Sequence, residues 1–168
     1  LCADEMRRLG LADVKAENGR VLCTGGPEEI PRLNLNLRTG ERVLILLGSF
    51  PAPTFDALFE GVKALPWEQF IPREGCFPVK GYCLDSALHA VPACQAIVKK
   101  AAAQRLGAHY GLGVLPETGA LYQIQFAIRR DVAALMLDTS GPGLYKRGYR
   151  AQGVAAPLRE TLAAALVL

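Results

Sequence analysis

A short segment rich in cations and tyrosines is the part of the sequence best suited to contact a nucleic acid. It covers residues 145–150 and reads Tyr-Lys-Arg-Gly-Tyr-Arg, so that Lys146, Arg147 and Arg150 stand among two tyrosines. Cations neutralise phosphates and release counterions, and aromatic faces stack on unpaired bases. A solvated linker between domains has the same composition, because short basic stretches are common. The residues alone leave both interpretations open.

A predicted helix over residues 92–105 offers a second group of cations. Its apolar residues recur at helical spacing on one face, which indicates that this face is buried. Three cations lie along the helix: Lys99, Lys100 and Arg105. Lys80, in a predicted strand beside Tyr82, adds a fourth. Phosphate binding and an ordinary solvent-exposed face both account for these charges.

Two further groups of residues could do covalent chemistry, and for both we favour a structural interpretation. Residues 138–141 read Asp-Thr-Ser-Gly and end a predicted strand. A carboxylate at a strand end can be catalytic, but these residue types also cap backbone groups in turns. Cys83 or His89 could serve a cysteine- or histidine-based catalyst, yet neither has a partner at a recognisable spacing. We therefore expect a turn at 138–141 and a buried thiol at Cys83.

The composition narrows the class of protein. Hydrophobic residues make up 51% and charged residues 21%, which is enough to bury a core, and the net charge of +3 is compatible with an anionic partner. No run of 18 apolar residues occurs, so no membrane span is expected. The five cysteines form no CxxC pair and show no metal-ligand spacing with the two histidines. This pattern predicts reduced thiols in a cytoplasmic protein without a metal site.

The first fifty residues predict a small α/β unit. Helix, strand, strand, helix and strand are expected in that order over residues 1–9, 11–17, 20–24, 27–37 and 41–50. Asn18-Gly19 between the first two strands is a strong hairpin signal. This order matches a ferredoxin-like unit (β-α-β-β-α-β) that has lost its first strand. Such a loss exposes a sheet edge, so we expect self-association through that edge.

The remaining residues predict a second unit, and the whole chain falls in the α+β class. Thr54 is expected to cap a helix that ends at Leu65. Strands are expected on both sides of the 92–105 helix and at the end of the unit: 76–86, 121–129 and 132–139. Arg130-Asp131 is expected to form a tight reversal, and a final helix is expected over 157–168. Both chain ends fall within helical patterns, so we expect a fragment of a longer protein.

Three blocks of sequence resemble one family. The first reads Phe-Pro-Val-Lys-Gly from Phe77, runs to Ser86, and continues over 92–100. The second is Glu-Thr-Gly-Ala-Leu from Glu117. The third and most specific block covers residues 138–141, 143–150 and 156–165. Together they resemble the N-terminal half of the THUMP-containing RNA methyltransferases, the bacterial large-subunit rRNA guanine-N2 methylase group.

The resemblance implies an architecture. Residues 1–50 resemble a ferredoxin-like N-terminal domain without its opening strand, 54–147 a THUMP domain, and 148–168 the connector and first helix of a methylase domain. In such enzymes the S-adenosylmethionine and catalytic motifs come later in the sequence, and neither motif occurs here. The resemblance therefore implies S-adenosylmethionine for the parent enzyme, and no cofactor, catalytic residue or metal ligand on this chain.

The resemblance also implies partners and contact residues. The partners would be structured RNA, in particular rRNA, and the chain's own methylase domain. The cations expected to position the RNA backbone are Lys80, Lys99, Lys100, Arg105, Lys146, Arg147 and Arg150. Such contacts fix the placement of RNA more than they read its sequence. Family members often carry Lys where this chain has Tyr82, so a phosphate contact from that position is not carried over.

Two alternatives stay open beside the RNA-binding module. The same pair of domains occurs in tRNA 4-thiouridine synthetases, although the Arg-Gly-Tyr-Arg block at 147–150 favours the methylase group. The chain could instead be a docking or dimerisation module that binds no RNA by itself.

Overall fold

The computed structural model describes residues 1–148 and 157–168. It divides into two compact units. Unit 1 combines residues 1–43 with 139–168, and unit 2 contains residues 44–138. Unit 1 is therefore built from two segments that are far apart in the sequence. The boundary between the units at residues 43 and 44 differs from the expected division near residues 50–54. Arg150, one of the expected contact residues, lies outside the described residues.

Unit 1 follows the first four elements of the predicted order. Helix α1 (Cys2–Arg8) leads to strands β1 (Ala12–Glu17) and β2 (Arg20–Thr24), and helix α2 (Glu29–Asn36) comes next. The two strands pair antiparallel in a sheet of their own, and Gly19 takes a positive φ of 80° in the predicted hairpin turn. A short 3-10 helix η2 (Leu144–Lys146) and helix α5 (Glu160–Val167) come from the C-terminal segment.

The C-terminal segment completes the core of unit 1. Leu144 packs with residues of the N-terminal segment: Met6, Leu11, Leu33, Leu37 and Val43. The expected turn at 138–141 forms, and its side chains bond to the backbone and to α2. Thr139 Oγ1 donates to the Val43 carbonyl at 2.8 Å, and Ser140 Oγ accepts from the Val43 N–H at 2.8 Å and donates to Asn34 Oδ1 at 2.7 Å. The structural interpretation of this turn is confirmed.

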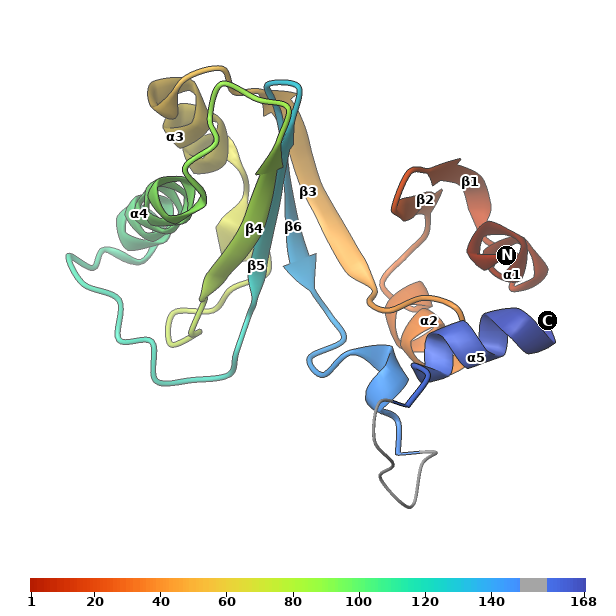
Figure 1. Cartoon of the computed structure of the whole chain (residues 1–168). Coiled ribbons are helices and arrows are strands. Elements are labelled where there is room, and N and C mark those ends of the chain that lie inside the picture. The colour runs from red at the N-terminus through yellow and green to blue at the C-terminus, as the bar shows by residue number, and fades with distance from the viewer. Residues whose placement is uncertain (149–156) are drawn as a thin grey trace. The chain divides into compact units, whose positions relative to one another are not determined.

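Unit 2 has two layers, a four-stranded sheet and two helices that lie on one side of it (Figure 1). The strands lie in the order β3 (Leu44–Pro51), β6 (Val132–Asp138), β5 (Ile124–Arg129) and β4 (Val79–Leu84). Only the β4–β5 pair is parallel. Helices α3 (Phe55–Ala64) and α4 (Val91–Tyr110) and the 3-10 helix η1 (Trp67–Gln69) complete the unit. Thr54 caps α3 as predicted, since its side chain accepts from the Ala57 N–H at 3.2 Å.

The strand expected over 41–50 forms, but in the other unit. It begins at Leu44 and pairs antiparallel with β6, from Leu44 opposite Asp138 to Pro51 opposite Val132. The sequence shows that this apolar stretch is extended, since β-rich residues fit a pleated surface. Its partner lies about eighty residues later, and local pattern carries no information on that pairing.

Helix α4 is longer than predicted. It continues beyond Arg105 to Tyr110 and ends at Gly111, which takes the left-handed φ of 66° that terminates many helices. Gly107 lies inside this helix without breaking it, and its position leaves no room for a side chain. A Cβ at Gly107 would lie 2.7 Å from the Leu112 carbonyl oxygen.

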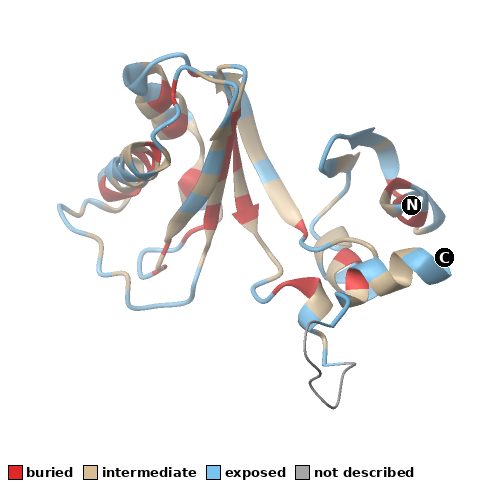
Figure 2. Ribbon diagram, in the orientation of Figure 1, coloured by how far each residue is buried: buried red, intermediate tan, exposed pale blue. Residues whose placement is uncertain are grey.

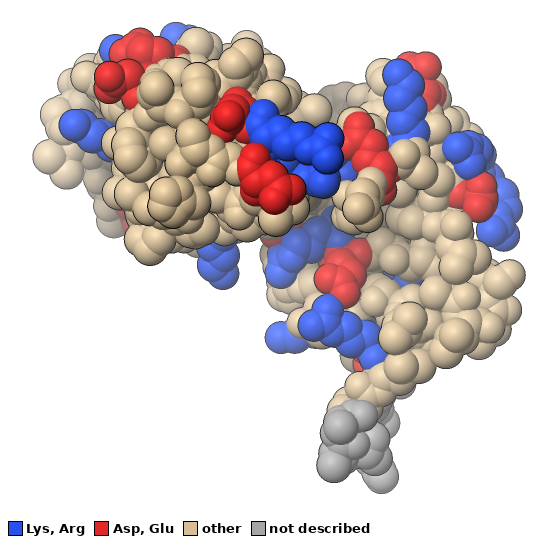
Figure 3. Space-filling model, turned by 45° about the horizontal axis from the view of Figure 1, so that its top comes forward, with Lys and Arg blue, Asp and Glu red and all other residues tan. Residues whose placement is uncertain are grey.

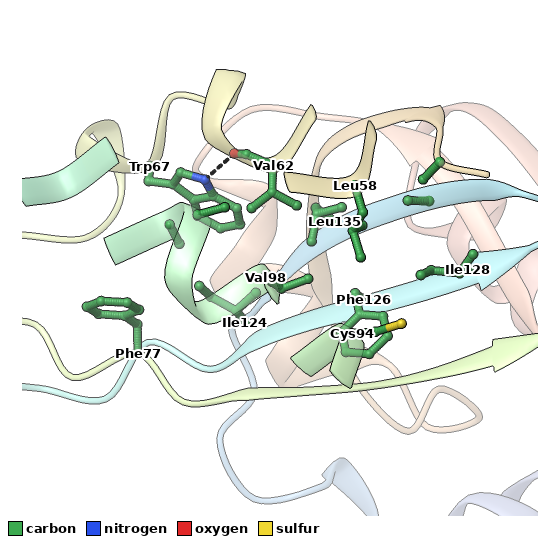
Figure 4. Close-up of a cluster of buried hydrophobic side chains, with 14 of the residues drawn as sticks. Leu58, Val62, Trp67, Phe77, Cys94, Val98, Ile124, Phe126, Ile128 and Leu135 are labelled. Carbon is green, nitrogen blue, oxygen red and sulfur yellow. Dashed lines mark hydrogen bonds between the residues drawn. The ribbon is translucent and has the colours of Figure 1, made fainter. Parts of the chain in front are cut away.

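The core of unit 2 lies between the sheet and its two helices. Figure 4 shows Ile124, Phe126 and Ile128 of β5 pointing toward α4 residues such as Val98, while Figure 2 shows the buried positions on these same elements. Trp67 is fully buried beside them, and its Nε1–H donates to the Val62 carbonyl at 2.7 Å. The strand predicted over 121–129 forms from Ile124 to Arg129.

The tight reversal between β5 and β6 is confirmed as well. Arg130 and Asp131 have φ values of 48° and 59°, which fit the twist of a two-residue hairpin. Among the described helices, none combines the length and the apolar character needed to cross a membrane.

Phe126→Ala should destabilise unit 2 by about 3–5 kcal/mol, because it leaves a cavity in the sheet–helix core. Phe126 is 1% exposed, and Trp67, the single tryptophan, reports unfolding of this unit by fluorescence. Urea titration would measure the change. Val114→Ala, at a side chain that is 86% exposed, serves as the control. Its free energy of unfolding should stay within about 0.5 kcal/mol of the wild type. Equal effects of the two substitutions would contradict this account of the core.

Candidate nucleic-acid interface

The cations singled out from the sequence differ in whether they already have partners within their own unit. Figure 3 shows several Lys and Arg side chains beside Asp or Glu on the face in view. Three of the seven expected contact residues have intramolecular partners: Lys99, Arg105 and Arg147. Three others are exposed: Lys80, Lys100 and Lys146. This difference decides which cations are available to a ligand.

Lys99 is bound within unit 2. Its Nζ donates to both oxygens of Glu117, at 2.7 and 2.6 Å, and to the Phe77 carbonyl at 3.1 Å. The same ammonium lies 3.5 Å from the centroid of the Phe77 ring. Burial raises the pKa of Glu117, but the hydrogen bonds from Lys99 and from the Phe77 N–H outweigh it and leave that pKa lowered. Lys99 therefore joins α4 to the segments around Phe77 and Glu117.

Arg105 is bound to Glu68 of η1. Its Nε and Nη2 donate to the two carboxylate oxygens at 3.0 and 2.5 Å, in the two-pronged geometry that guanidinium groups favour. The hydrogen bond from Arg105 lowers the pKa of Glu68 to about 2. This pair holds α4 against the segment that follows α3.

Arg147 bonds to the C-terminal end of α2. One of its guanidinium nitrogens donates to the Leu37 carbonyl at 2.5 Å and another donates to the Asn34 carbonyl. These carbonyls lie in the last turn of α2 and just after it, where a helix lacks intrahelical partners. Arg147 thus ties the C-terminal segment to α2, and its guanidinium group also lines a groove in unit 1.

This groove gathers three arginines from distant positions. Arg8 of α1, Arg38 after α2, and Arg147 line it together with the exposed side chain of Leu35. Glu5 at its base is 4% exposed and accepts four hydrogen bonds, from the N–H and side chain of Arg38 and of Thr39. Its negative charge is therefore balanced locally, and the groove as a whole favours an anion.

Sequence reasoning missed Arg8 and Arg38. Each stands near the predicted C-terminal end of a helix, where a basic residue is ordinary. A signal for a shared site was absent, because residues 8, 38 and 147 meet only when the two segments of unit 1 fold together. The arginine groove, defined as the groove lined by Arg8, Arg38 and Arg147, is the first candidate interface.

The exposed cations of unit 2 lie on different elements. Lys80 is exposed on β4, an edge strand of the sheet. Lys100 is exposed on α4 and lines a shallow groove with Gln104, Val114 and Glu117. That groove follows the C-terminal half of α4, where helix carbonyls and a carboxylate disfavour a phosphate. Lys80 is therefore better placed than Lys100 for an anionic ligand.

The geometry around the cysteines gives little support to a thiol catalyst. Cys83 Sγ lies 3.8 Å from Cys94 Sγ, and burial raises the pKa of Cys94 to about 12. A thiolate, which is the reactive form, is strongly disfavoured there. The His89 ring hydrogen-bonds with the Ala87 carbonyl at 3.0 Å. Among the described residues, neither Cys83 nor His89 has the paired base or acid that such catalysis requires.

Comparisons with known proteins agree with this two-part organisation. Residues 1–44 match a family described as the RlmL ferredoxin-like domain, and residues 52–138, about half of the chain, match the THUMP domain family. The chain belongs to the THUMP domain family. Its THUMP domain coincides with unit 2 except for β3, and the ferredoxin-like match lies in unit 1.

Similar proteins extend well beyond this chain. It is 47% identical over 167 residues to "Putative RNA methyltransferase YpsC" of Bacillus subtilis, which covers 98% of the chain and 43% of that protein. It is 35% identical over 170 residues to "Ribosomal RNA large subunit methyltransferase K/L" of Syntrophotalea carbinolica, covering 100% of the chain and 24% of that protein.

A solved structure is similar throughout the chain. A protein of Listeria monocytogenes, described as "a predicted N6-adenine-specific DNA methylase", superposes with a TM-score of 0.94 at 50% identity, over 99% of this chain and 44% of that one. The chain thus spans less than half the length of each of these relatives. The THUMP domain and its ferredoxin-like companion are the part they share with it.

Lys99→Met should lower the free energy of unfolding by about 1–2 kcal/mol, because it removes the two hydrogen bonds that Lys99 donates to the half-buried Glu117 carboxylate. Lys100→Met removes the same charge from the adjacent exposed residue and should stay within about 0.5 kcal/mol of the wild type. Urea unfolding followed by Trp67 fluorescence measures both. Equal stabilities of the two variants would show that Lys99 is not a structural cation.

The Glu68–Arg105 pair should make stability depend on acid pH. The folded-state pKa of Glu68, about 2, lies below its ordinary value of 4.5, so the pair stabilises above pH 4.5 and loses its effect as pH falls toward 2. At neutral pH Glu68→Gln should lower the free energy of unfolding by about 1–2 kcal/mol. The effect is no larger because solvent around the partly exposed Arg105 screens the pair.

Urea titrations from pH 7 down to pH 3 test this expectation. The difference in unfolding free energy between the wild type and Glu68→Gln should stay constant down to about pH 5 and narrow below it. Glu60→Gln, at an exposed acid on α3, is the control and should show no such trend. A difference that is constant with pH would rule out the charge of Glu68 as the source of its effect.

Proposed function

We propose that this chain is the RNA-binding part of an S-adenosylmethionine-dependent RNA methyltransferase that acts on large-subunit ribosomal RNA, with guanine N2 as the methylated atom. The observation that carries this proposal is the THUMP domain match, next to a ferredoxin-like match of the RlmL type. Two relatives, one named as a putative RNA methyltransferase and the other as a ribosomal RNA large subunit methyltransferase, support the RNA substrate.

The arginine groove supplies the chemistry for binding the RNA backbone. Guanidinium groups bind phosphate oxygens in pairs, and several phosphates can contact three neighbouring arginines. Arg38 and Arg147 each use part of their donors within unit 1, so the groove is held in place before a ligand arrives. The exposed Lys80, Lys100 and Lys146 would add weaker, longer-range attraction. Lys99 and Arg105 would act indirectly, by holding α4 in position.

The described residues do not fit S-adenosylmethionine. A methylase of this kind binds that cofactor at a glycine-rich turn between a strand and a helix. Gly111 and Gly113 follow helix α4 instead, and the loop after them leads into β5. We therefore assign no cofactor contact and no catalytic step to this chain. Its proposed role is to bind the RNA and place a nucleotide for a methylase domain.

Two other functions are compatible with some of the observations. The name of the Listeria relative suggests a DNA substrate, and a phosphate-binding groove would also attract DNA. A docking or dimerisation module would use the sheet edges, since β3 and β4 are the outer strands of the unit 2 sheet and β1 and β2 pair only with each other among the described strands. The three-arginine groove favours a nucleic acid over a purely structural module.

Binding to structured RNA should be measurable and should weaken steeply with salt, because phosphate contacts release counterions. Fluorescence anisotropy of a labelled rRNA hairpin, titrated with the 168-residue chain from about 50 to 200 mM salt, tests this. A DNA hairpin of the same sequence should bind more weakly. Absence of binding to any RNA by a folded sample at low salt would overturn the proposed function. Tighter binding to DNA than to RNA would overturn it in favour of a DNA substrate.

Arg8→Glu should weaken RNA binding about tenfold at low salt and reduce the salt slope, because it reverses a charge in the arginine groove. Arg8 is exposed, and the one hydrogen bond of its side chain in the described residues is a long one to Asp4 of the same helix, so the fold should tolerate the change. Lys15→Glu makes the same charge change on β1, away from the groove lining, and should lower affinity much less.

A further inference from the structure

The unit 2 sheet has one open face. Helices α3 and α4 cover the side toward which Phe126 points, and alternation along the strands turns the neighbouring residues to the other side (Figures 1 and 4). On that open face Leu46, Tyr82, Leu84 and Val132 are 47%, 50%, 46% and 44% exposed. An apolar and aromatic sheet face that is this exposed marks a binding surface more often than a plain solvent face.

The pairing register divides the open face into transverse rows. The middle row runs across all four strands and contains Tyr82, Ala127, Ala134 and Ser49. Ala127 and Ala134 are 4% and 6% exposed, which shows that larger neighbours shield them. The row on one side contains Gln125 and Met136, and the row on the other contains Arg129 and Val132.

Tyr82 is therefore an exposed aromatic side chain at the end of a row of small side chains. From Ala127 to Ser49 these small side chains span two strand spacings, about 10 Å. The Tyr82 side chain is 50% exposed at the β4 end of the row. A flat, partly apolar group of the size of a nucleic-acid base can stack on its ring.

Cations lie in the rows on both sides of the row that contains Tyr82. Lys80 precedes Tyr82 by two residues on β4, and Arg129 follows Ala127 by two residues on β5. Among the described residues, no hydrogen bond or ion pair engages the side chains of Tyr82, Lys80 and Arg129, which leaves them available to a ligand. Asp138, the acid on this face, already accepts a hydrogen bond from Gln125 at 2.9 Å.

We propose that this open face holds one unpaired nucleotide of the bound RNA, with its base stacked on Tyr82 and its flanking phosphates at Lys80 and Arg129. An exposed aromatic ring between two cations is the usual combination for single-stranded RNA, since stacking and phosphate contacts reinforce each other. Base-paired RNA offers no free base face to the ring, because its bases are stacked on one another. This inference rests on the proposed function and names the surface that holds the unpaired segment.

The test uses the 168-residue chain and two labelled RNA hairpins that share one stem, one of them blunt and the other with a short unpaired tail. Tyr82→Ala should weaken binding of the tailed hairpin about fivefold or more, while Tyr82→Phe should retain it within about twofold, since the ring and not the hydroxyl stacks. Lys80→Ala with Arg129→Ala should also weaken it and reduce its salt slope. Lys63→Ala, at a cation on the helical side, is the matched control.

Photo-crosslinking tests the contact between the unpaired tail and Tyr82 directly. A tail that carries 5-bromouridine should photo-crosslink to the tryptic peptide that contains Tyr82, and circular dichroism should show that every variant is folded. Tailed and blunt hairpins that bind the wild type alike, with no effect of Tyr82→Ala, would overturn this inference and leave the proposed function standing. Failure of the wild type to bind either hairpin would overturn the proposed function itself. Loss of self-association in Tyr82→Ala, with unchanged RNA binding, would identify the face as a protein interface and also overturn the inference.

Discussion

The antiparallel pairing of β3 with β6 is the constraint on which the rest of the structure depends. The chain enters unit 2 through β3 and leaves it through β6, and the two strands are paired from Leu44 opposite Asp138 to Pro51 opposite Val132. Entry and exit therefore lie at the same end of the sheet, where Thr139 N–H donates to the Val43 carbonyl at 3.1 Å. Residues after 139 can then complete unit 1, because their starting point is fixed beside residue 43.

The arginine groove follows from this closure. Leu144 enters the apolar core of unit 1, and three residues later Arg147 bonds to the last carbonyls of α2. The folding of unit 2 already brings residues 43 and 139 together. Closing this loop of nearly a hundred residues therefore adds no separate entropy cost when the C-terminal segment joins unit 1. The groove joins Arg8, Arg38 and Arg147 only because unit 2 brings the two segments of unit 1 together.

The cations of this chain divide into two groups that differ in burial and partners. Lys99 and Arg105 have half-buried carboxylates opposite them and hold α4 to the rest of unit 2. Lys80 and Arg129 have no such partner among the described residues and lie on the open face of the sheet, in the rows on either side of Tyr82. A cation that is already paired within the fold gives little to a ligand, because binding would break one charge-assisted bond to form another. Position in the fold, more than residue type, decides which role each cation has.

The sequence by itself determined the local elements and the family. The helical spacing in residues 92–105, Asn18-Gly19, Thr54 and the 138–141 turn are short-range signals, and the structure confirms each of them. The blocks that resemble THUMP proteins were equally readable, since they are runs of neighbouring residues. The tertiary structure alone decided that β3 belongs to the second sheet, that Glu117 and Glu68 engage Lys99 and Arg105, and that three arginines share a groove. Strand pairing and side-chain contacts between distant segments depend on how the apolar faces pack, and no local pattern contains that information.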